Sequence, residues 1–144
     1  MNDTIQFIST QSKLAVVGVS DKKFGGEIYK TLKRHGYTVY GVHPTRKTFA
    51  GDTCYGSLKE VQVDVKAAVI VVSPKFAEPI VDDAIAAEMT HLWFQLGNDY
   101  SSLVRKAQEN GIKTVSRKCI LMYAQPVSGI HKFHRGLAKF FGRF

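Results

Sequence analysis

The chain has 144 residues, a length typical of one compact domain, and a formal net charge of +8 from 20 Lys and Arg against 12 Asp and Glu. Its two cysteines, Cys54 and Cys119, exclude a disulfide framework and favour a reducing compartment, so we expect a cytoplasmic protein. The first residues lack a basic segment followed by an apolar run, which argues against a secretory signal and a membrane span.

Strands and helices alternate along the predicted chain. In chain order, the predicted elements are a short helix carrying Ile5, Phe7 and Ile8, a strand over 14–19, a helix over 26–35, a strand over 38–42, a brief turn over 58–61, a strand over 67–72, a helix over 74–87, a strand over 91–95, a helix over 101–110 and a strand over 112–115. This alternation predicts an α/β fold, a doubly wound parallel sheet of about five strands with helices on both faces.

The first predicted strand and the turn after it favour a phosphorylated ligand. An apolar strand that runs through a small-residue turn into a helix directs backbone N–H groups and a helix N-terminus toward a phosphate. A dinucleotide fingerprint requires three glycines, but here Ser20 stands at the second position and Gly25 and Gly26 come later. Gly18 and Ser20 are therefore candidate phosphate contacts in a longer turn.

The second predicted strand ends in basic residues. The residues directly after Val42 include no Asp or Glu to hold the ribose hydroxyl of NAD, whereas Arg46 and Lys47 lie within five positions of Val42. These cations suit a phosphorylated ribose, either the 3′-phospho-ADP of coenzyme A (CoA) or the 2′-phosphate of NADP. An NADP-dependent reductase is thus an alternative, although no substrate domain is recognisable.

Ligands of doubly wound sheets bind at the carboxyl ends of the strands. The predicted strand ends supply backbone donors, hydroxyls, an amide, prolines and cations, but no pair of carboxylates. The residues at these ends are Gly18, Val19, Ser20, His43, Pro44, Ser73, Pro74, Gln95, Leu96, Gly97, Arg117, Lys118 and Cys119. This edge of the sheet is suited to holding a phosphorylated molecule, and we predict no catalytic constellation there.

A series of short motifs resembles the small CoA-binding-domain family over residues 12–124. The motifs are Val16-Val-Gly-Val-Ser20, His35-Gly-Tyr37, Val42-His-Pro44, Gly51-x-x-Cys54-Tyr55, Leu92-Trp-Phe-Gln-Leu-Gly97 and Arg117-x-Cys119. The family's fold is similar to the N-terminal CoA-binding domain of the succinyl-CoA synthetase alpha subunit. The resemblance implies one Rossmann-like domain that binds CoA or an acyl-CoA.

The resemblance also implies where the parts of CoA lie. Gly18, Ser20 and Lys22 would lie at the pyrophosphate, His43, Pro44 and Arg46 would frame the adenosine phosphate, Ser73 and Pro74 would flank the nucleotide, and Gln95 to Gly97 would face the pantetheine. The residues expected to contact the cofactor are Gly18, Val19, Ser20, Lys22, Val42, His43, Pro44, Arg46, Lys47, Ser73, Pro74, Gln95, Leu96 and Gly97.

The chain departs from the pattern of the family that it resembles in ways that bear on activity. Many members of the family carry Asn-Pro where this chain has His43-Pro44, so the resemblance places His43 near the adenosine phosphate but does not define a contact for its side chain. The synthetase domain that carries a phosphorylated histidine and the nucleotide-binding partner subunit have no counterpart here. We therefore expect binding without catalysis, and a partner that is either a second copy of the chain or an enzyme that uses the bound CoA.

The remaining reactive and basic residues are more typical of structural roles than of catalysis or metal binding. Cys119 follows two cations that favour a thiolate, but no base is assignable beside it, and a buried thiol is the commoner role. His131 and His134 have a metal-compatible spacing without further ligands nearby, so we predict no metal site. Residues 128–144 predict a basic amphipathic helix that docks on the domain or on a second subunit. A nucleic-acid or regulatory interaction module using this tail is a further alternative.

Overall fold

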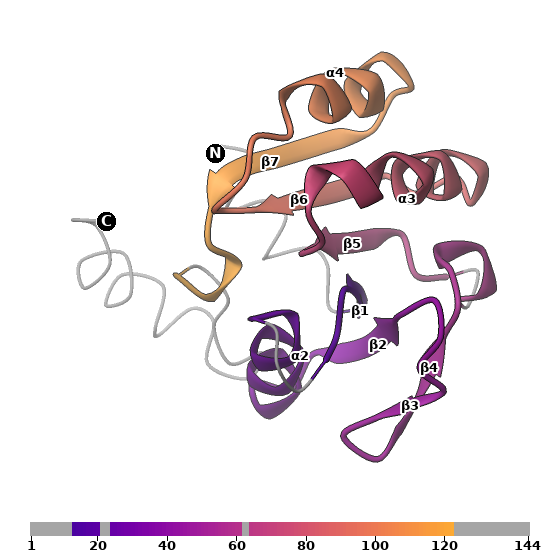
Figure 1. Ribbon diagram of the computed structural model, residues 1–144, viewed down its shortest axis with the longest axis vertical. Coiled ribbons are helices and arrows are strands. Elements are labelled where there is room, and N and C mark those ends of the chain that lie inside the picture. Colours follow the sequence, from indigo (N-terminus) through magenta and orange to yellow (C-terminus); the bar gives the residue numbers. More distant parts are fainter. Residues whose placement is uncertain (1–12, 21–23, 62–63, 123–144) are drawn as a thin grey trace.

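The computed structural model describes residues 13–20, 24–61 and 64–122, which form a seven-stranded sheet flanked by helices (Figure 1). The strands are β1 (Lys13–Val17), β2 (Thr38–Val42), β3 (Thr48–Phe49), β4 (Asp52–Tyr55), β5 (Ala67–Ile70), β6 (His91–Gln95) and β7 (Lys113–Lys118). The helices are α2 (Phe24–Arg34), α3 (Pro74–Ala86) and α4 (Ser101–Glu109), with 3-10 turns η1 (Leu58–Glu60) and η2 (Ile120–Met122).

The sheet has the order β3-β4-β2-β1-β5-β6-β7, and every neighbouring pair except β3-β4 is parallel. The predicted doubly wound α/β fold is confirmed. Because β1 is flanked by β2 on one side and β5 on the other, the chain reverses its direction of winding there. Crevices at such a switch point are where ligands of these folds bind.

The sheet has more strands than predicted because of a hairpin at one edge. Strands β3 and β4 are short and antiparallel, and Ala50 and Gly51 join them with φ angles of 52° and 83°. Two consecutive positive φ angles match a two-residue hairpin turn of type I′. An alanine at the first turn position conceals this hairpin, since the usual signal is Asn-Gly or Asp-Gly.

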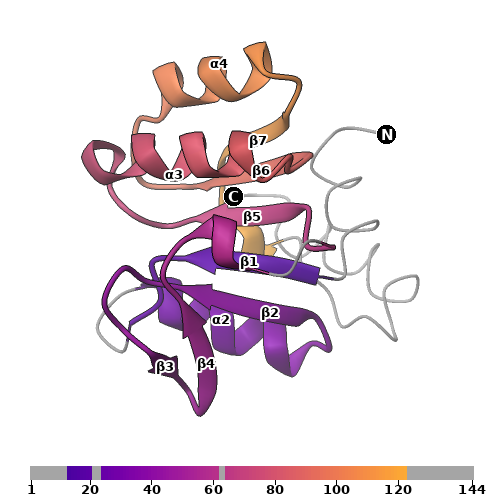
Figure 2. The same ribbon diagram turned by 90° about the vertical axis from the view of Figure 1, so that its right-hand side faces the viewer.

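Helices cover both faces of the sheet (Figure 2). On one face α3 and α4 pack on residues such as Val17, Ile70 and Phe94. On the other, α2 packs through Ile28, Tyr29 and Leu32 on a cluster that contains the fully buried Trp93. Strands covered on both faces read as continuous apolar runs, which is why the central strands could be predicted from the sequence.

The strands at the centre of the sheet end earlier than predicted. Strand β1 stops at Val17 and β5 stops at Ile70, two residues before the expected ends. Of the residues that follow, Gly18, Val71 and Val72 line the cavity described below. Strand β7 instead runs on to Lys118, past an irregularity opposite Phe94 and Gln95. Arg117 is the extra residue at this irregularity, and its backbone adopts a left-handed conformation with a φ of 63°.

Several predictions concern residues outside the described ranges. These are the short helix at residues 5–8, Lys22, the helix over 128–144, and the pair His131 and His134.

Within residues 13–20, 24–61 and 64–122, no three His, Cys, Asp or Glu side chains come together as metal ligands. None of the helices in these ranges is both long and apolar enough to cross a bilayer.

Candidate functional site

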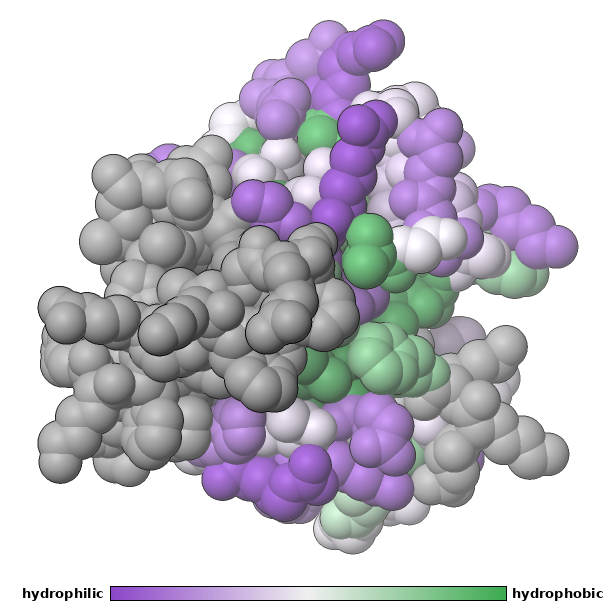
Figure 3. Space-filling model, turned by 90° about the vertical axis from the view of Figure 1, so that its left-hand side faces the viewer, coloured by the Kyte–Doolittle hydropathy of each residue, from purple (hydrophilic) through white to green (hydrophobic). Residues whose placement is uncertain are grey.

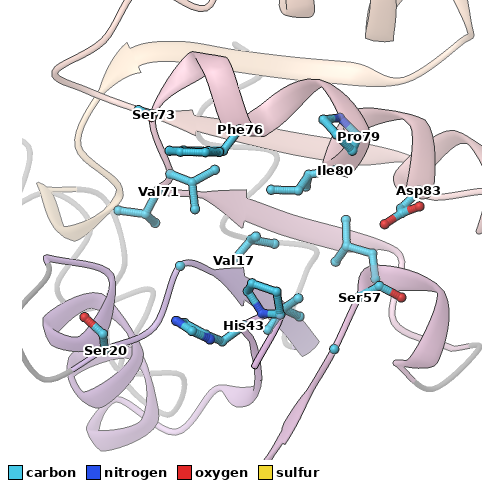
Figure 4. Close-up of a pocket in the computed structure, with 16 residues that line it drawn as sticks. Val17, Ser20, His43, Ser57, Val71, Ser73, Phe76, Pro79, Ile80 and Asp83 are labelled. Atoms are coloured by element: carbon cyan, nitrogen blue, oxygen red, sulfur yellow. The ribbon is translucent and has the colours of Figure 1, made fainter. Parts of the chain in front are cut away.

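A cavity of about 620 Å³ opens at the carboxyl ends of β1, β2, β4 and β5 (Figure 4). It lies at the switch point of the sheet, with helix α3 as one wall. Its lining residues are Val17, Gly18, Ser20, Val42, His43, Pro44, Gly56, Ser57, Leu58, Val71, Val72, Ser73, Phe76, Pro79, Ile80 and Asp83. Apolar walls with a few polar groups are typical of a small-molecule site.

Gly18 begins the turn after β1 and contributes space to the cavity. Its φ of 108° is one that L side chains rarely adopt, and an added Cβ would lie 3.0 Å from Val72 Cγ1. Its N–H donates to the carbonyl of Val42 at 3.0 Å, so it is not a spare phosphate donor. Val19, which was also a candidate contact, is fully buried and does not line the cavity.

Gly25 and Gly26 let α2 approach this turn closely. A Cβ at Gly25 would lie 2.3 Å from the carbonyl oxygen of Gly18, and one at Gly26 would lie 2.1 Å from that of Ser20. These distances are too short for any side chain, so both positions require glycine. The two residues thus perform the packing role of the third fingerprint glycine, although their spacing differs from the fingerprint.

His43 organises the loop after β2. Its Nδ1 accepts the backbone N–H of Thr45 at 3.2 Å and that of Arg46 at 3.1 Å. This bonding assigns the proton of the neutral ring to Nε2, which leaves that nitrogen a donor. The ring therefore closes the turn as an Asn side chain does in an Asx turn, and it also lines the cavity.

The two cations after β2, Arg46 and Lys47, follow the cavity-lining residues His43 and Pro44 in the chain but do not line the cavity themselves. The Arg46 guanidinium lies over the Phe49 ring, 5.5 Å from its centroid, and donates to the carbonyl of Thr48 at 3.3 Å. Lys47 is exposed in the same loop. Stacking on an aromatic ring restricts the guanidinium and keeps its charge near the loop that His43 shapes.

The hairpin that carries Phe49 is braced against α2. The Tyr29 ring meets the Phe49 ring edge-on at 5.4 Å, and its hydroxyl donates to Asp52 at 2.8 Å. Lys33 also pairs with Asp52, and the hydrogen bonds from Lys33 and Tyr29 hold the pKa of that carboxyl below its usual range. The stacking partner of Arg46 is therefore fixed by the fold.

The start of α3 forms the upper wall of the cavity in Figure 4. Ser73 is the N-cap residue but makes no capping hydrogen bond with its side chain, and it lines the cavity; Pro74 at the first helical position does not. Val72 is fixed through its carbonyl, which accepts the Tyr100 hydroxyl. Burial raises the pKa of this hydroxyl and so keeps it protonated as a donor.

The segment from Gln95 to Gly97 lies further along the same edge and does not line the cavity. Gln95 is only 4% exposed, and its side-chain oxygen accepts the N–H of Ile120 at 3.1 Å, so its amide joins β6 to the chain after β7. Leu96 is about half exposed. Figure 3 shows apolar residues gathered across this face between hydrophilic side chains.

Sequence reasoning did not single out the wall of the cavity away from the glycine turn. This wall is formed by Gly56, Ser57 and Leu58 after β4, and by Phe76, Pro79, Ile80 and Asp83 on α3. Phe76 is 62% exposed, so it lines the cavity without being part of the buried core.

Cys119 is buried and does not line this cavity. The second cysteine, Cys54, is buried on β4, and burial raises the pKa of its thiol. Neither thiol has the exposed, electropositive setting of a reactive cysteine.

Comparison with known proteins identifies the family. Residues 12–125 match the family described as the CoA binding domain. The chain belongs to this family. An ADP-forming acetate–CoA ligase I of Archaeoglobus fulgidus is 29% identical over 121 residues, covering 76% of this chain but only 18% of the ligase. The resemblance to the small CoA-binding-domain family is thus confirmed, and the chain spans under a fifth of that ligase.

Solved structures agree with this assignment. A hypothetical protein from Pyrococcus horikoshii has a TM-score of 0.77 and 26% identity, covering 92% of this chain and 89% of that one. The dinucleotide-forming acetyl-coenzyme A synthetase 1 of Ca. Korarchaeum cryptofilum, in complex with phosphate and ADP, has a TM-score of 0.68 and 28% identity. The match covers 79% of this chain and 27% of the synthetase.

Proposed function

We propose that this CoA-binding domain holds CoA or an acyl-CoA reversibly in the cavity at the switch point, without chemistry of its own. The observation that carries the proposal is the cavity, which combines a glycine-containing turn at one end with apolar walls. The pyrophosphate would lie against the turn after Gly18, near the N-terminus of α2. The adenosine half would extend between His43 and α3, and the pantetheine would leave along the edge toward Leu96.

Native mass spectrometry of the protein purified without added ligand tests this proposal directly. We expect CoA or an acyl-CoA to be retained, and added CoA to raise the melting temperature by mass action. Retention of NADP, or a larger shift with NADP than with CoA, would contradict the proposal in favour of a reductase. A protein that neither retains nor responds to CoA would also overturn it.

The 3′-phosphate of CoA is the group we assign to Arg46. We expect Arg46→Gln to weaken CoA binding about tenfold, because a charge-assisted hydrogen bond contributes about 1.5 kcal/mol, and to leave the affinity for dephospho-CoA unchanged. Isothermal calorimetry with both ligands measures the difference. Arg34→Gln, the same change at the far end of α2, is the control and should alter neither affinity. Equal losses for the two ligands would exclude Arg46 from contact with the 3′-phosphate.

Absence of covalent chemistry is the prediction for Cys119. Because the thiol is buried outside the cavity, we expect incubation with acetyl-CoA to leave the intact mass of the protein unchanged, and Cys119→Ser to bind CoA with the wild-type affinity. A stoichiometric acetyl adduct that the serine variant lacks would instead make this residue a nucleophile and the protein an enzyme.

We further propose that the bound CoA is passed to a partner enzyme, or shared with a second copy of the chain. The relatives that support this are ADP-forming acetate–CoA ligases, of which this chain matches between 15% and 18%. A cytoplasmic location agrees with the two cysteines, which are unpaired and buried.

A further inference from the structure

The two ends of the cavity differ in charge. In Figure 4, Ser20 and the glycine turn lie at one end, and Asp83 and Ser57 lie at the other. Phe76, Pro79 and Ile80 form an apolar stretch between them. A carboxylate disfavours phosphate and accepts hydrogen bonds from N–H and O–H donors. The Asp83 carboxylate is therefore unsuited to direct contact with a phosphate group of a ligand.

Asp83 is positioned to accept hydrogen bonds from a ligand. Its side chain is only 25% exposed, and its partner, Lys59 Nζ, lies 3.8 Å from Oδ1, beyond hydrogen-bond distance. Within the described ranges, no hydrogen bond is donated to this carboxylate from the protein. A partly buried acceptor without a donor is satisfied when a ligand supplies one.

We propose, on the basis of the proposed function, that Asp83 recognises the exocyclic amine of the adenine base and so selects adenine-bearing CoA over analogues that lack this donor. With the pyrophosphate at the glycine turn, the ribose lies nearest His43 and Pro44. The base is the group that reaches past the apolar stretch of α3, whose side chains suit a flat ring. Its amine then meets the carboxylate at the far end.

The neighbouring residue Asp82 provides a matched control. Asp82 lies on the same helix but forms an ion pair with Lys106 of α4 and does not line the cavity. Substituting it removes the same charge from the same helix without changing the cavity. Asp82→Asn therefore separates a contact with the base from a general change in charge or helix stability.

The experiment compares CoA with its deaminated analogue, in which hypoxanthine replaces adenine and a carbonyl oxygen replaces the amine. We expect the wild-type protein and Asp82→Asn to bind CoA about tenfold more tightly than the analogue, measured by calorimetry. Asp83→Asn should bind the two within about twofold of each other, because an amide both accepts and donates. Melting curves of each variant verify the fold.

Results that contradict the recognition of adenine can be distinguished from results that contradict CoA binding itself. Equal binding of both ligands by the wild-type protein, or a tenfold preference that persists in Asp83→Asn, would overturn the recognition of adenine while leaving CoA binding intact. Loss of preference in Asp82→Asn as well would attribute the effect to charge and overturn the assignment. Failure of the wild-type protein to bind CoA at all would instead refute the proposed function.

Discussion

Gly26→Ala is expected to lower the free energy of unfolding by about 3 kcal/mol or more and to abolish CoA binding. The added Cβ would lie 2.1 Å from the carbonyl oxygen of Ser20 and 2.9 Å from Phe49 Cζ, so helix α2 and the turn after β1 must separate. The same movement displaces the backbone proposed to receive the pyrophosphate. Urea denaturation measures the first effect, and calorimetry of the folded fraction measures the second.

Gly51→Ala is the control for this prediction. Gly51 has a φ of 83°, but no atom lies within 4 Å of where its Cβ would be. Its substitution therefore costs only the backbone strain of a left-handed alanine, about 1 to 2 kcal/mol, and leaves CoA binding unchanged. If Gly26→Ala were no more destabilising than Gly51→Ala, the close approach of α2 to the turn would not be important for stability.

The glycines also show how far the sequence could guide the choice of variants. The spacing predicts a phosphate turn at Gly18, and a branched residue there would be expected to block ligand binding in a folded domain. In the structure, the φ of 108° and the contact with Val72 make any such residue strained. Gly18→Val thus changes stability and the cavity together, and it does not isolate the binding contribution.

Most strands inside the sheet could be predicted because a strand that is covered on both faces carries apolar residues along most of its length. Strands β2 and β6 have the predicted bounds, and turn residues mark where each one ends; β6 is buried over four of its five residues, whereas β2 is buried only at Gly41 and Val42. The edge hairpin of β3 and β4 could not be predicted, since its two-residue and four-residue strands carry no clear alternation. Pairing at an edge depends on neighbours that are distant in sequence, which a local pattern does not contain.

Only one side of the lining of the candidate site could be predicted from the sequence. Residues at the ends of β1, β2 and β5 follow from the rule that ligands bind at carboxyl strand ends, and Gly18, His43 and Ser73 do line the cavity. The same rule selected Gln95, whose side chain is committed to Ile120. It could not select Phe76 or Asp83, because helical spacing alone does not distinguish a residue that lines a cavity from one that packs in the core.

Phe76→Glu is expected to weaken CoA binding about a hundredfold while leaving the fold intact. Phe76 lines the cavity but is 62% exposed, so little core packing is lost, and a carboxylate in the first turn of α3 is favourable for the helix. Like charges brought together at a binding interface cost several kcal/mol, of which about 2.7 kcal/mol corresponds to a hundredfold change in Kd. Calorimetry measures the loss, and melting in the absence of ligand verifies the fold.

Two further variants separate the charge from the lost ring. Ser102→Glu adds the same charge to the exposed first turn of α4, outside the cavity lining, and solvent screening should leave CoA affinity unchanged there. Phe76→Leu keeps an apolar wall and should cost less than tenfold. If Phe76→Glu bound CoA as tightly as Ser102→Glu, the anionic ligand would not pass this wall, and the cavity beneath α3 could not be its binding site.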